Sequence, residues 1–293
     1  MGSVGTGTAS GERMVQANGV ELCVETFGNP VDPAILFLAG AGGSMDWWAD
    51  EFCARLAQEG RYVIRYDHRD TGRSTHYPPG AAPYKLADLA ADAIGLLDAL
   101  AVDRAHFVGL SMGGWISQLA AIEHPARVAS LTLIATRPTG FGDSDSDLPG
   151  MDEELAASFE VEAPPTDWSD REAAITALIE SERPFVGVHP FDETATRAIA
   201  TRVFERSANL ESTMSNHFVS QGERWRERLG TIAAPTLVLH GSVDPMFPIG
   251  NGEALAREIP GARLVSLEGM GHEYPPRPLW DTVIAALVAH TAG

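Results

Sequence analysis

Short apolar runs recur along this chain, separated by longer segments whose apolar residues have helical spacing. The run AILFLAG (34–40) carries no polar side chain, which is typical of a strand covered on both faces of a parallel sheet. Residues 85–100 instead place leucine and alanine three and four positions apart, the spacing of one helix face. This alternation predicts an α/β fold with a mostly parallel sheet.

The pattern predicts eight strands. The Asn18-Gly19 turn suggests that strand 20–28 is the second arm of a hairpin. The remaining predicted strands are 34–40, 61–67, 105–110, 128–136, 235–241 and 262–269. The predicted helices between and after them are 46–59, 85–100, 112–124, 250–258 and 279–290.

The strand rhythm stops at residues 138–228, which contain no convincing buried strand. Four amphipathic helices are predicted there, over 151–161, 169–182, 192–208 and 211–228. A helical block between two strands of a parallel sheet indicates a cap, or lid. The predicted organisation is therefore a flexible tail (1–13), a core (14–137 and 229–293) and a helical cap (138–228).

Charge and composition exclude several classes of partner. The chain of 293 residues has 40 acidic and 21 basic side chains, a net charge of −19, which disfavours nucleic acid and anionic membrane surfaces. No apolar run approaches the ~18 residues of a membrane span, and the first residues lack the features of a signal peptide. We expect a cytoplasmic monomer or homodimer in which Cys23 and Cys53 are free thiols.

A candidate nucleophile lies where strand 105–110 meets helix 112–124. Gly109-Leu110-Ser111-Met112-Gly113 has the G-x-S-x-G pattern, and small neighbours let a serine occupy a sharp, strained turn between strand and helix. The turn would raise the hydroxyl above the sheet, beside a helix N-terminus that favours negative charge. Ser111 is the predicted nucleophile.

A serine needs a base to remove its proton and an acid to orient that base. Asp244 follows strand 235–241, and His272 follows strand 262–269. Both come after Ser111 in the order serine, acid, histidine. All three residues stand beyond the carboxyl ends of strands, where ligands bind in open α/β sheets. We predict a Ser111-Asp244-His272 triad.

An acyl-transfer enzyme also needs N–H donors for a developing oxyanion. One would be Met112, and the second would come from the glycine-rich loop that follows strand 34–40. Ala41 is the favoured donor there and Gly42 the alternative. A dinucleotide-binding fingerprint is excluded, because Met45 stands where that motif requires its third glycine.

Large apolar residues near these motifs are candidates to line a substrate pocket. Core packing is the competing interpretation, and it is favoured for Trp115. The candidate pocket residues are Gly40, Gly42, Trp47, Trp115, Phe141, Phe185, Met246, Phe247 and Tyr274.

These motifs resemble the α/β-hydrolase superfamily over about 15–137 and 232–291. The loop 67–74, DHRDTGRS, resembles a loop of that family, with Asp70 where glycine is usual. Together with the elbow GLSMG, it is most similar to aclacinomycin methylesterase-like proteins of actinomycete polyketide pathways. We expect Asp67 to pair with Arg69 or Arg73 beneath the elbow and to brace the oxyanion loop.

The resulting functional hypothesis is a serine hydrolase that cleaves a carboxylic ester. The resemblance implies a methyl ester of a bulky, polyketide-type acid as the substrate. The same triad could instead cleave a C–C bond or a lactone, or catalyse perhydrolysis. A non-catalytic ligand-binding protein of this fold is the more distant alternative. The predicted chemistry requires no metal and no organic cofactor.

Overall fold

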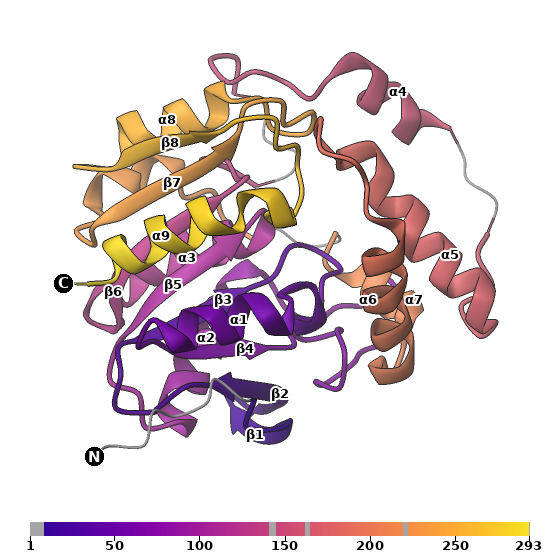
Figure 1. The fold of residues 1–293 in the computed structure, drawn as a ribbon, viewed down its shortest axis with the longest axis horizontal. Helices are drawn as coiled ribbons and strands as arrows, with labels where there is room; N and C mark the ends of the chain where they lie inside the picture. The colour runs from indigo at the N-terminus through magenta and orange to yellow at the C-terminus, as the bar shows by residue number, and fades with distance from the viewer. Residues whose placement is uncertain (1–8, 141–144, 162–164, 219–221, 293) are drawn as a thin grey trace.

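The computed structural model describes residues 9–140, 145–161, 165–218 and 222–292. Its centre is one eight-stranded sheet with the strand order β1-β2-β4-β3-β5-β6-β7-β8 (Figure 1). Pairings from β4 onward are parallel, whereas β2 runs antiparallel to both of its neighbours. The strands are β1 Arg13–Ala17, β2 Val20–Phe27, β3 Ala34–Leu38, β4 Tyr62–Tyr66, β5 Ala105–Leu110, β6 Val128–Ile134, β7 Thr236–Gly241 and β8 Arg263–Leu267.

The amino-terminal hairpin forms as its turn predicts. Asn18 and Gly19 both have positive φ, 48° and 79°, as the two central residues of a type I′ turn require. Part of the predicted flexible tail, from residue 9 onward, is also attached to the sheet. Ser10 N–H donates to Thr26 O at 2.8 Å. Glu12 forms ion pairs with two arginines.

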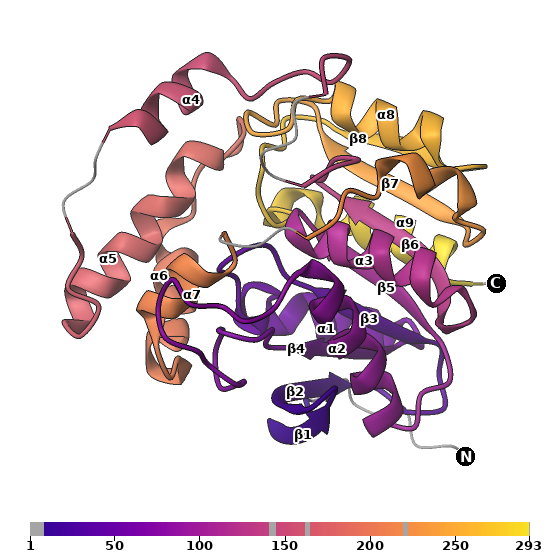
Figure 2. The ribbon, with the colours of Figure 1, turned by 180° about the vertical axis from the view of Figure 1, so that it is seen from behind.

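Helices cover both faces of the sheet (Figures 1 and 2). One face packs against α1 Asp50–Gln58 and α9 Trp280–His290. The other packs against α2 Leu86–Ala99, α3 Met112–Glu123 and α8 Gly250–Glu258. A parallel sheet covered in this way is the arrangement that the continuous apolar strands predict.

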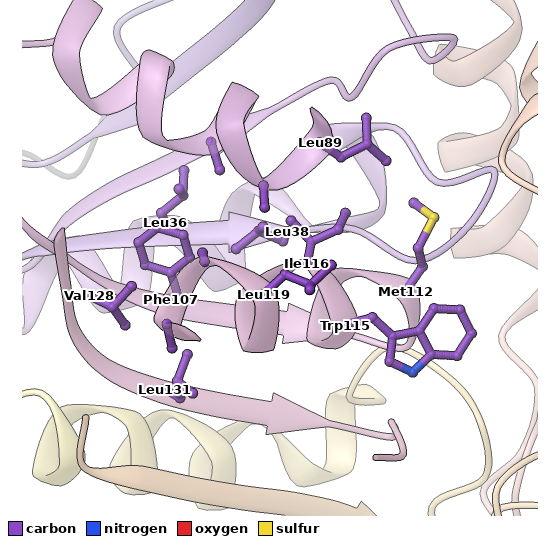
Figure 3. Close-up of a cluster of buried hydrophobic side chains, with 14 of the residues drawn as sticks. Leu36, Leu38, Leu89, Phe107, Met112, Trp115, Ile116, Leu119, Val128 and Leu131 are labelled. Carbon is purple, nitrogen blue, oxygen red and sulfur yellow. The ribbon is translucent and has the colours of Figure 1, made fainter. Parts of the chain in front are cut away.

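Strand β3 shows why those runs lack polar residues. Leu36 and Leu38 point toward α2 and α3, where they join Phe107 and Ile116 in one buried cluster (Figure 3). The alternate residue Phe37 belongs to the cluster on the opposite face. Successive side chains of a strand point to opposite faces, so both sets must be apolar.

The segment between β6 and β7 is helical in its described parts. It holds α4 Glu153–Glu160, α5 Arg171–Glu182, α6 Glu193–Arg206 and α7 Leu210–Asn216, which lie together to one side of the sheet in Figures 1 and 2. Ala174, Ile175 and Leu178 of α5 pack against Ala200 and Val203 of α6 in a separate small core.

The helix predicted over 211–228 is wrong in its second half. The α-helix ends at Asn216, and a 3₁₀ helix follows at Arg226–Thr231. Gly222, within the predicted range, has φ +80°, a left-handed conformation that a right-handed helix cannot contain.

Arg206 at the end of α6 attaches this segment to the sheet. Its guanidinium lies 2.7 Å from Asp67 Oδ2 and 2.7 Å from Glu12 Oε1, and it also pairs with Asp46. The expected pairing of Asp67 with Arg69 or Arg73 is therefore wrong: Arg69 pairs with Asp92, and Arg73 pairs with Glu12. The α6 arginine comes from a segment that no local pattern connects with residue 67.

Asp67 nevertheless braces the loop that follows β3. Its Oδ1 accepts the N–H of Met45 at 3.0 Å, and its Oδ2 accepts the N–H of Arg73 at 3.0 Å. A Cβ on Gly72 would lie 2.1 Å from Asp67 Oδ2, so glycine is required for this close approach.

Both cysteines are free and buried, as predicted. Burial raises the pKa of the Cys23 and Cys53 thiols to about 12, so neither is a reactive thiolate at neutral pH. Among the described residues, no helix combines the length and apolar character that crossing a membrane requires. Cytoplasmic location and oligomeric state stay predictions.

His68 gives a pH-dependent contribution to stability. It is 1% exposed, and burial lowers its pKa from 6.5 to about 3. Between these two pH values the unfolded chain binds the extra proton, so folding becomes less favourable as pH falls. The maximum slope is about 1.4 kcal/mol per pH unit for one group.

We expect urea unfolding at pH 5.5 and pH 7.5 to reveal this contribution. The wild type should lose about 1 kcal/mol more of unfolding free energy on acidification than His68→Leu, which has nothing to protonate there. Identical pH dependence in the two proteins would contradict the assignment.

Candidate active site

Ser111 occupies a strained turn between β5 and α3. Its backbone has φ 52° and ψ −117°, a conformation that costs a non-glycine residue free energy unless the surroundings impose it. They do so here, because Ser111 N–H donates to Ile134 O at 3.0 Å and Thr136 Oγ1 donates to Ser111 O at 2.8 Å.

The two glycines of the G-x-S-x-G motif are sterically required. A Cβ on Gly109 would lie 2.1 Å from Gly113 O, and one on Gly113 would lie 2.2 Å from Leu38 O. Strand and helix can therefore meet this closely only with glycine at both positions. This packing supports the sequence argument that a serine in such a sharp turn needs small neighbours on both sides.

The structure brings the three predicted triad residues together. His272 Nε2 lies 3.0 Å from Ser111 Oγ, and His272 Nδ1 lies 3.0 Å from Asp244 Oδ2. The other carboxylate oxygen, Oδ1, accepts the N–H groups of Met246 at 2.9 Å and Phe247 at 2.7 Å. The carboxylate is thus fixed in orientation, and one oxygen is left for the imidazole.

Two loops carry the other predicted triad residues: the acid loop (242–249) holds Asp244, and the histidine loop (268–276) holds His272. Glycines let these two loops approach each other. A Cβ on Gly241 would lie 2.2 Å from Met270 O, and one on Gly271 would lie 2.1 Å from Phe185 O. The N–H of His272 donates to that same Phe185 carbonyl at 2.8 Å. The residues between β6 and β7 therefore help to place the imidazole of His272.

The candidate oxyanion donors lie on the loop after β3 and at the start of α3. In that loop, Gly40 N–H donates to Tyr274 Oη at 3.1 Å, Gly42 N–H to His217 Nδ1 at 2.9 Å, and Gly43 N–H to Gly40 O at 3.0 Å. Among the described residues, the N–H groups of Ala41 and Met112 donate to no protein acceptor. This favours Ala41 over the alternative donor Gly42.

Aromatic side chains surround His272. The ring of Phe247 meets the imidazole edge-on with centroids 4.9 Å apart, and the ring of Phe185 lies 5.8 Å away. Ser111 and His272 are 6% and 9% exposed, so these residues exclude most water from the triad. Low water content strengthens charge interactions in such a site.

The remaining pocket candidates have mixed positions. Trp115 is fully buried and belongs to the core (Figure 3), as the alternative interpretation favoured. Met246 is 9% exposed beside Asp244. Trp47 stacks on Tyr274 with centroids 5.9 Å apart, and Tyr274 also holds Gly40. Phe141 lies outside the described residues.

A cavity of about 580 Å³ lies beside the acid loop. It is formed by α4, the residues on either side of Phe185 and the residues on either side of Asp244. Its apolar lining consists of Leu155, Pro184, Val186, Val188, Val243 and Pro245. A volume of this size can hold a drug-sized molecule. The sequence-based candidates missed these lining residues, although Phe185 and Met246 are their neighbours.

Two buried histidines outside the triad were also missed. His240 lies near the end of β7, four residues before Asp244: its Nε2 lies 2.6 Å from Phe247 O and 3.5 Å from Asp244 Oδ2. Burial lowers the pKa of His240, so the neutral ring donates to that carbonyl and ties the acid loop to the end of β7. His217 contacts the oxyanion loop. The position of His240 beside the acid motif was a usable signal, whereas His217 had none.

Comparisons with known proteins agree with this fold. A family model described as the alpha/beta hydrolase fold matches residues 33–274. Rhodomycin D methylesterase DauP of Streptomyces sp. strain C5 is 34% identical and covers 95% of this chain and 97% of its own length. Rhodomycin D methylesterase DnrP of Streptomyces peucetius is 32% identical, with the same two coverages.

Solved structures show the same architecture. The enol-lactonase of Burkholderia xenovorans LB400 superposes with a TM-score of 0.73 at 26% identity, covering 96% of this chain and all of that one. The esterase EaEST of Exiguobacterium antarcticum has a TM-score of 0.77 at 22% identity, with coverages of 96% and 99%, and shows the fold alone.

The chain therefore belongs to the alpha/beta hydrolase family. Its relatives place it among the carboxylic ester hydrolases of that family.

Proposed function

We propose that the protein hydrolyses a methyl ester of a bulky, polyketide-type acid through a Ser111-His272-Asp244 triad. One observation carries the proposal: His272 lies 3.0 Å from both the Ser111 hydroxyl and the Asp244 carboxylate. Two rhodomycin D methylesterases that span nearly the whole chain support the methyl ester as substrate class.

The mechanism follows from the hydrogen-bond directions. Asp244 accepts a hydrogen bond from His272 Nδ1–H, which keeps the proton on Nδ1 and leaves Nε2 unprotonated and able to take the Ser111 proton. Ser111 Oγ then attacks the ester carbonyl, and Asp244 stabilises the resulting imidazolium. His272 returns its proton to the leaving methanol and next activates the water that releases the acid from Ser111.

The oxyanion would be stabilised by the N–H groups of Ala41 and Met112. Neither is engaged by a protein acceptor in the described part of the chain, and Met112 begins a helix whose N-terminus favours negative charge. The acid part of the substrate would occupy the cavity beside the acid loop, whose lining combines apolar residues with the polar side chains of Asp152, Glu154 and Ser158.

Lactone hydrolysis is the second candidate. The enol-lactonase structure, at 26% identity and nearly complete coverage, favours it over the other reactions that this triad could catalyse. Lactone opening releases no alcohol, so the two functions differ in their products. We also propose that the helical segment at 138–228 acts as a cap over the hydrolase core.

Two measurements test the proposed function. A fluorophosphonate probe should add once to the wild type and not at all to Ser111→Ala, as read by intact mass. A panel of methyl esters of polycyclic acids should then release methanol in equal amount with the free acid. An unlabelled, folded wild type would reject the serine mechanism, and turnover of lactones without methyl esters would favour the second candidate.

A further inference from the structure

His217 connects the helical segment with the candidate oxyanion loop. It follows α7 directly, is 3% exposed, and lies with Nδ1 2.9 Å from Gly42 N and Nε2 2.7 Å from Arg69 O. A backbone N–H only donates and a carbonyl oxygen only accepts. The imidazole must therefore be the neutral tautomer with its proton on Nε2.

The residue that His217 holds is part of a tight turn. Gly43 N–H donates to Gly40 O at 3.0 Å, and Gly42 has φ +71°, which are the features of a type II turn centred on Ala41 and Gly42. Types I and II differ by a rotation of the central peptide, here the Ala41–Gly42 peptide. The bond to His217 fixes that peptide in one of the two orientations.

Ala41, the proposed oxyanion donor, is the first central residue of this turn, and its N–H belongs to the preceding Gly40–Ala41 peptide. Tyr274 Oη holds the preceding N–H, that of Gly40, so the turn is fixed from both sides. Tyr274 comes from the histidine loop and His217 from the helical segment. The Ala41 N–H is left to meet a substrate oxygen.

We propose that His217 is a positioning residue for the oxyanion site: by accepting the Gly42 N–H it anchors the turn, and so holds in place the Gly40–Ala41 peptide that carries the Ala41 donor. The inference rests on the proposed function and deepens it. The segment between β6 and β7 then contributes to transition-state stabilisation as well as to covering the site.

The position of α7 does not depend on His217 alone. Thr213 Oγ1 donates to Asp70 O at 2.6 Å, and Asn216 Nδ2 donates to Pro78 O at 3.2 Å. Removing the imidazole should therefore change the turn while α7 stays attached. This separation allows the two roles to be tested independently.

Two near-isosteric variants separate the two bonds of His217. Asn places its Oδ1 where Nδ1 stands and can accept the Gly42 N–H, whereas the amide of Gln reaches the Nε2 position and keeps only the Arg69 bond. His217→Leu keeps neither bond and serves as a second loss variant. Thr213→Val is the control, because it removes an α7 attachment without touching the turn.

The readouts are the second-order rate of fluorophosphonate addition to Ser111 and kcat and KM for a p-nitrophenyl ester. We expect His217→Gln and His217→Leu to lower the addition rate and kcat by about 10²-fold, the smaller of the effects seen on losing an oxyanion donor, with little change in KM. His217→Asn should restore both within about threefold of wild type. Thr213→Val should lower the melting temperature and leave both rates unchanged.

Equal rates for the Asn and Gln variants, or a loss confined to KM, would overturn the role of His217 while the serine mechanism stands. A Thr213→Val variant as slow as His217→Gln would also overturn it, because loosening of α7 would then explain the loss. Absence of fluorophosphonate addition to the wild type would instead overturn the proposed function, and this inference with it.

Discussion

Ser111→Ala is expected to lower kcat for ester hydrolysis roughly 10⁵–10⁶-fold, the loss typical of removing a triad serine. The variant keeps the backbone bonds that fix the turn, since Ser111 N–H and Ser111 O make them rather than the hydroxyl. Its far-ultraviolet circular dichroism and melting temperature should therefore match the wild type closely. Steady-state kinetics on the most active methyl ester provide the measurement.

Ser117→Ala is the matched control for this prediction. Ser117 lies in α3, the helix that begins directly after Ser111, and its hydroxyl donates to Gly113 O at 2.7 Å. Its replacement by alanine therefore removes the same atom at a place without chemistry. Its turnover should remain near that of the wild type. Binding and oxyanion contacts alone leave a residual rate far below about 1% of wild-type turnover. If Ser111→Ala retained more than this, Ser111 could not be the nucleophile.

The parts of the fold that the sequence predicts are those determined locally. Continuous apolar strands such as 34–40 require cover on both faces, and β3 has it. The Asn18-Gly19 turn prefers one geometry, and the structure has it. Ser111, Asp244 and His272 could be selected because each follows a strand and the parallel topology gathers those ends at one edge of the sheet.

The parts that were missed depend on contacts between distant residues. Arg206 reaches Asp67 and His217 reaches Gly42 across 139 and 175 positions, and neither residue belongs to a motif. Arg69 was the expected partner of Asp67 because it is near in sequence, yet Asp92 on α2 holds it. Charge and spacing alone cannot choose among several arginines when helices from another part of the chain supply one.

Two aromatic residues predicted to line the pocket have other contacts in the structure. Tyr274 was selected as a pocket residue, and the structure places its hydroxyl on Gly40 N–H, where it supports the oxyanion turn. Trp115 packs in the core. Near the acid loop, the apolar residues that line the cavity of about 580 Å³ are small or medium in size, so a selection by aromatic size did not include them.

Asp244→Asn is expected to lower kcat about 10⁴-fold, as in other triads whose acid becomes an amide. The structure supplies the reason. Two backbone N–H groups hold the Oδ1 position, so the amide oxygen must stay there and the amide nitrogen must face His272 Nδ1. A donor at that place forces the imidazole proton onto Nε2, which then cannot accept the proton of Ser111.

Asp170→Asn is the matched control, because Asp170 also accepts a backbone N–H, that of Ala173 at the start of α5, and asparagine caps a helix about as well as aspartate. Its activity should equal that of the wild type, and both variants should melt within a few degrees of it. If Asp244→Asn instead kept its rate, the acid would have to be another carboxylate, and the fixed orientation of Asp244 would serve only the loop. Proton transfer through His272 governs both ester hydrolysis and fluorophosphonate addition, so the two rates must fall together in Asp244→Asn. A large loss of hydrolysis with an unchanged rate of fluorophosphonate addition would therefore be equally informative, because it would contradict this role of Asp244.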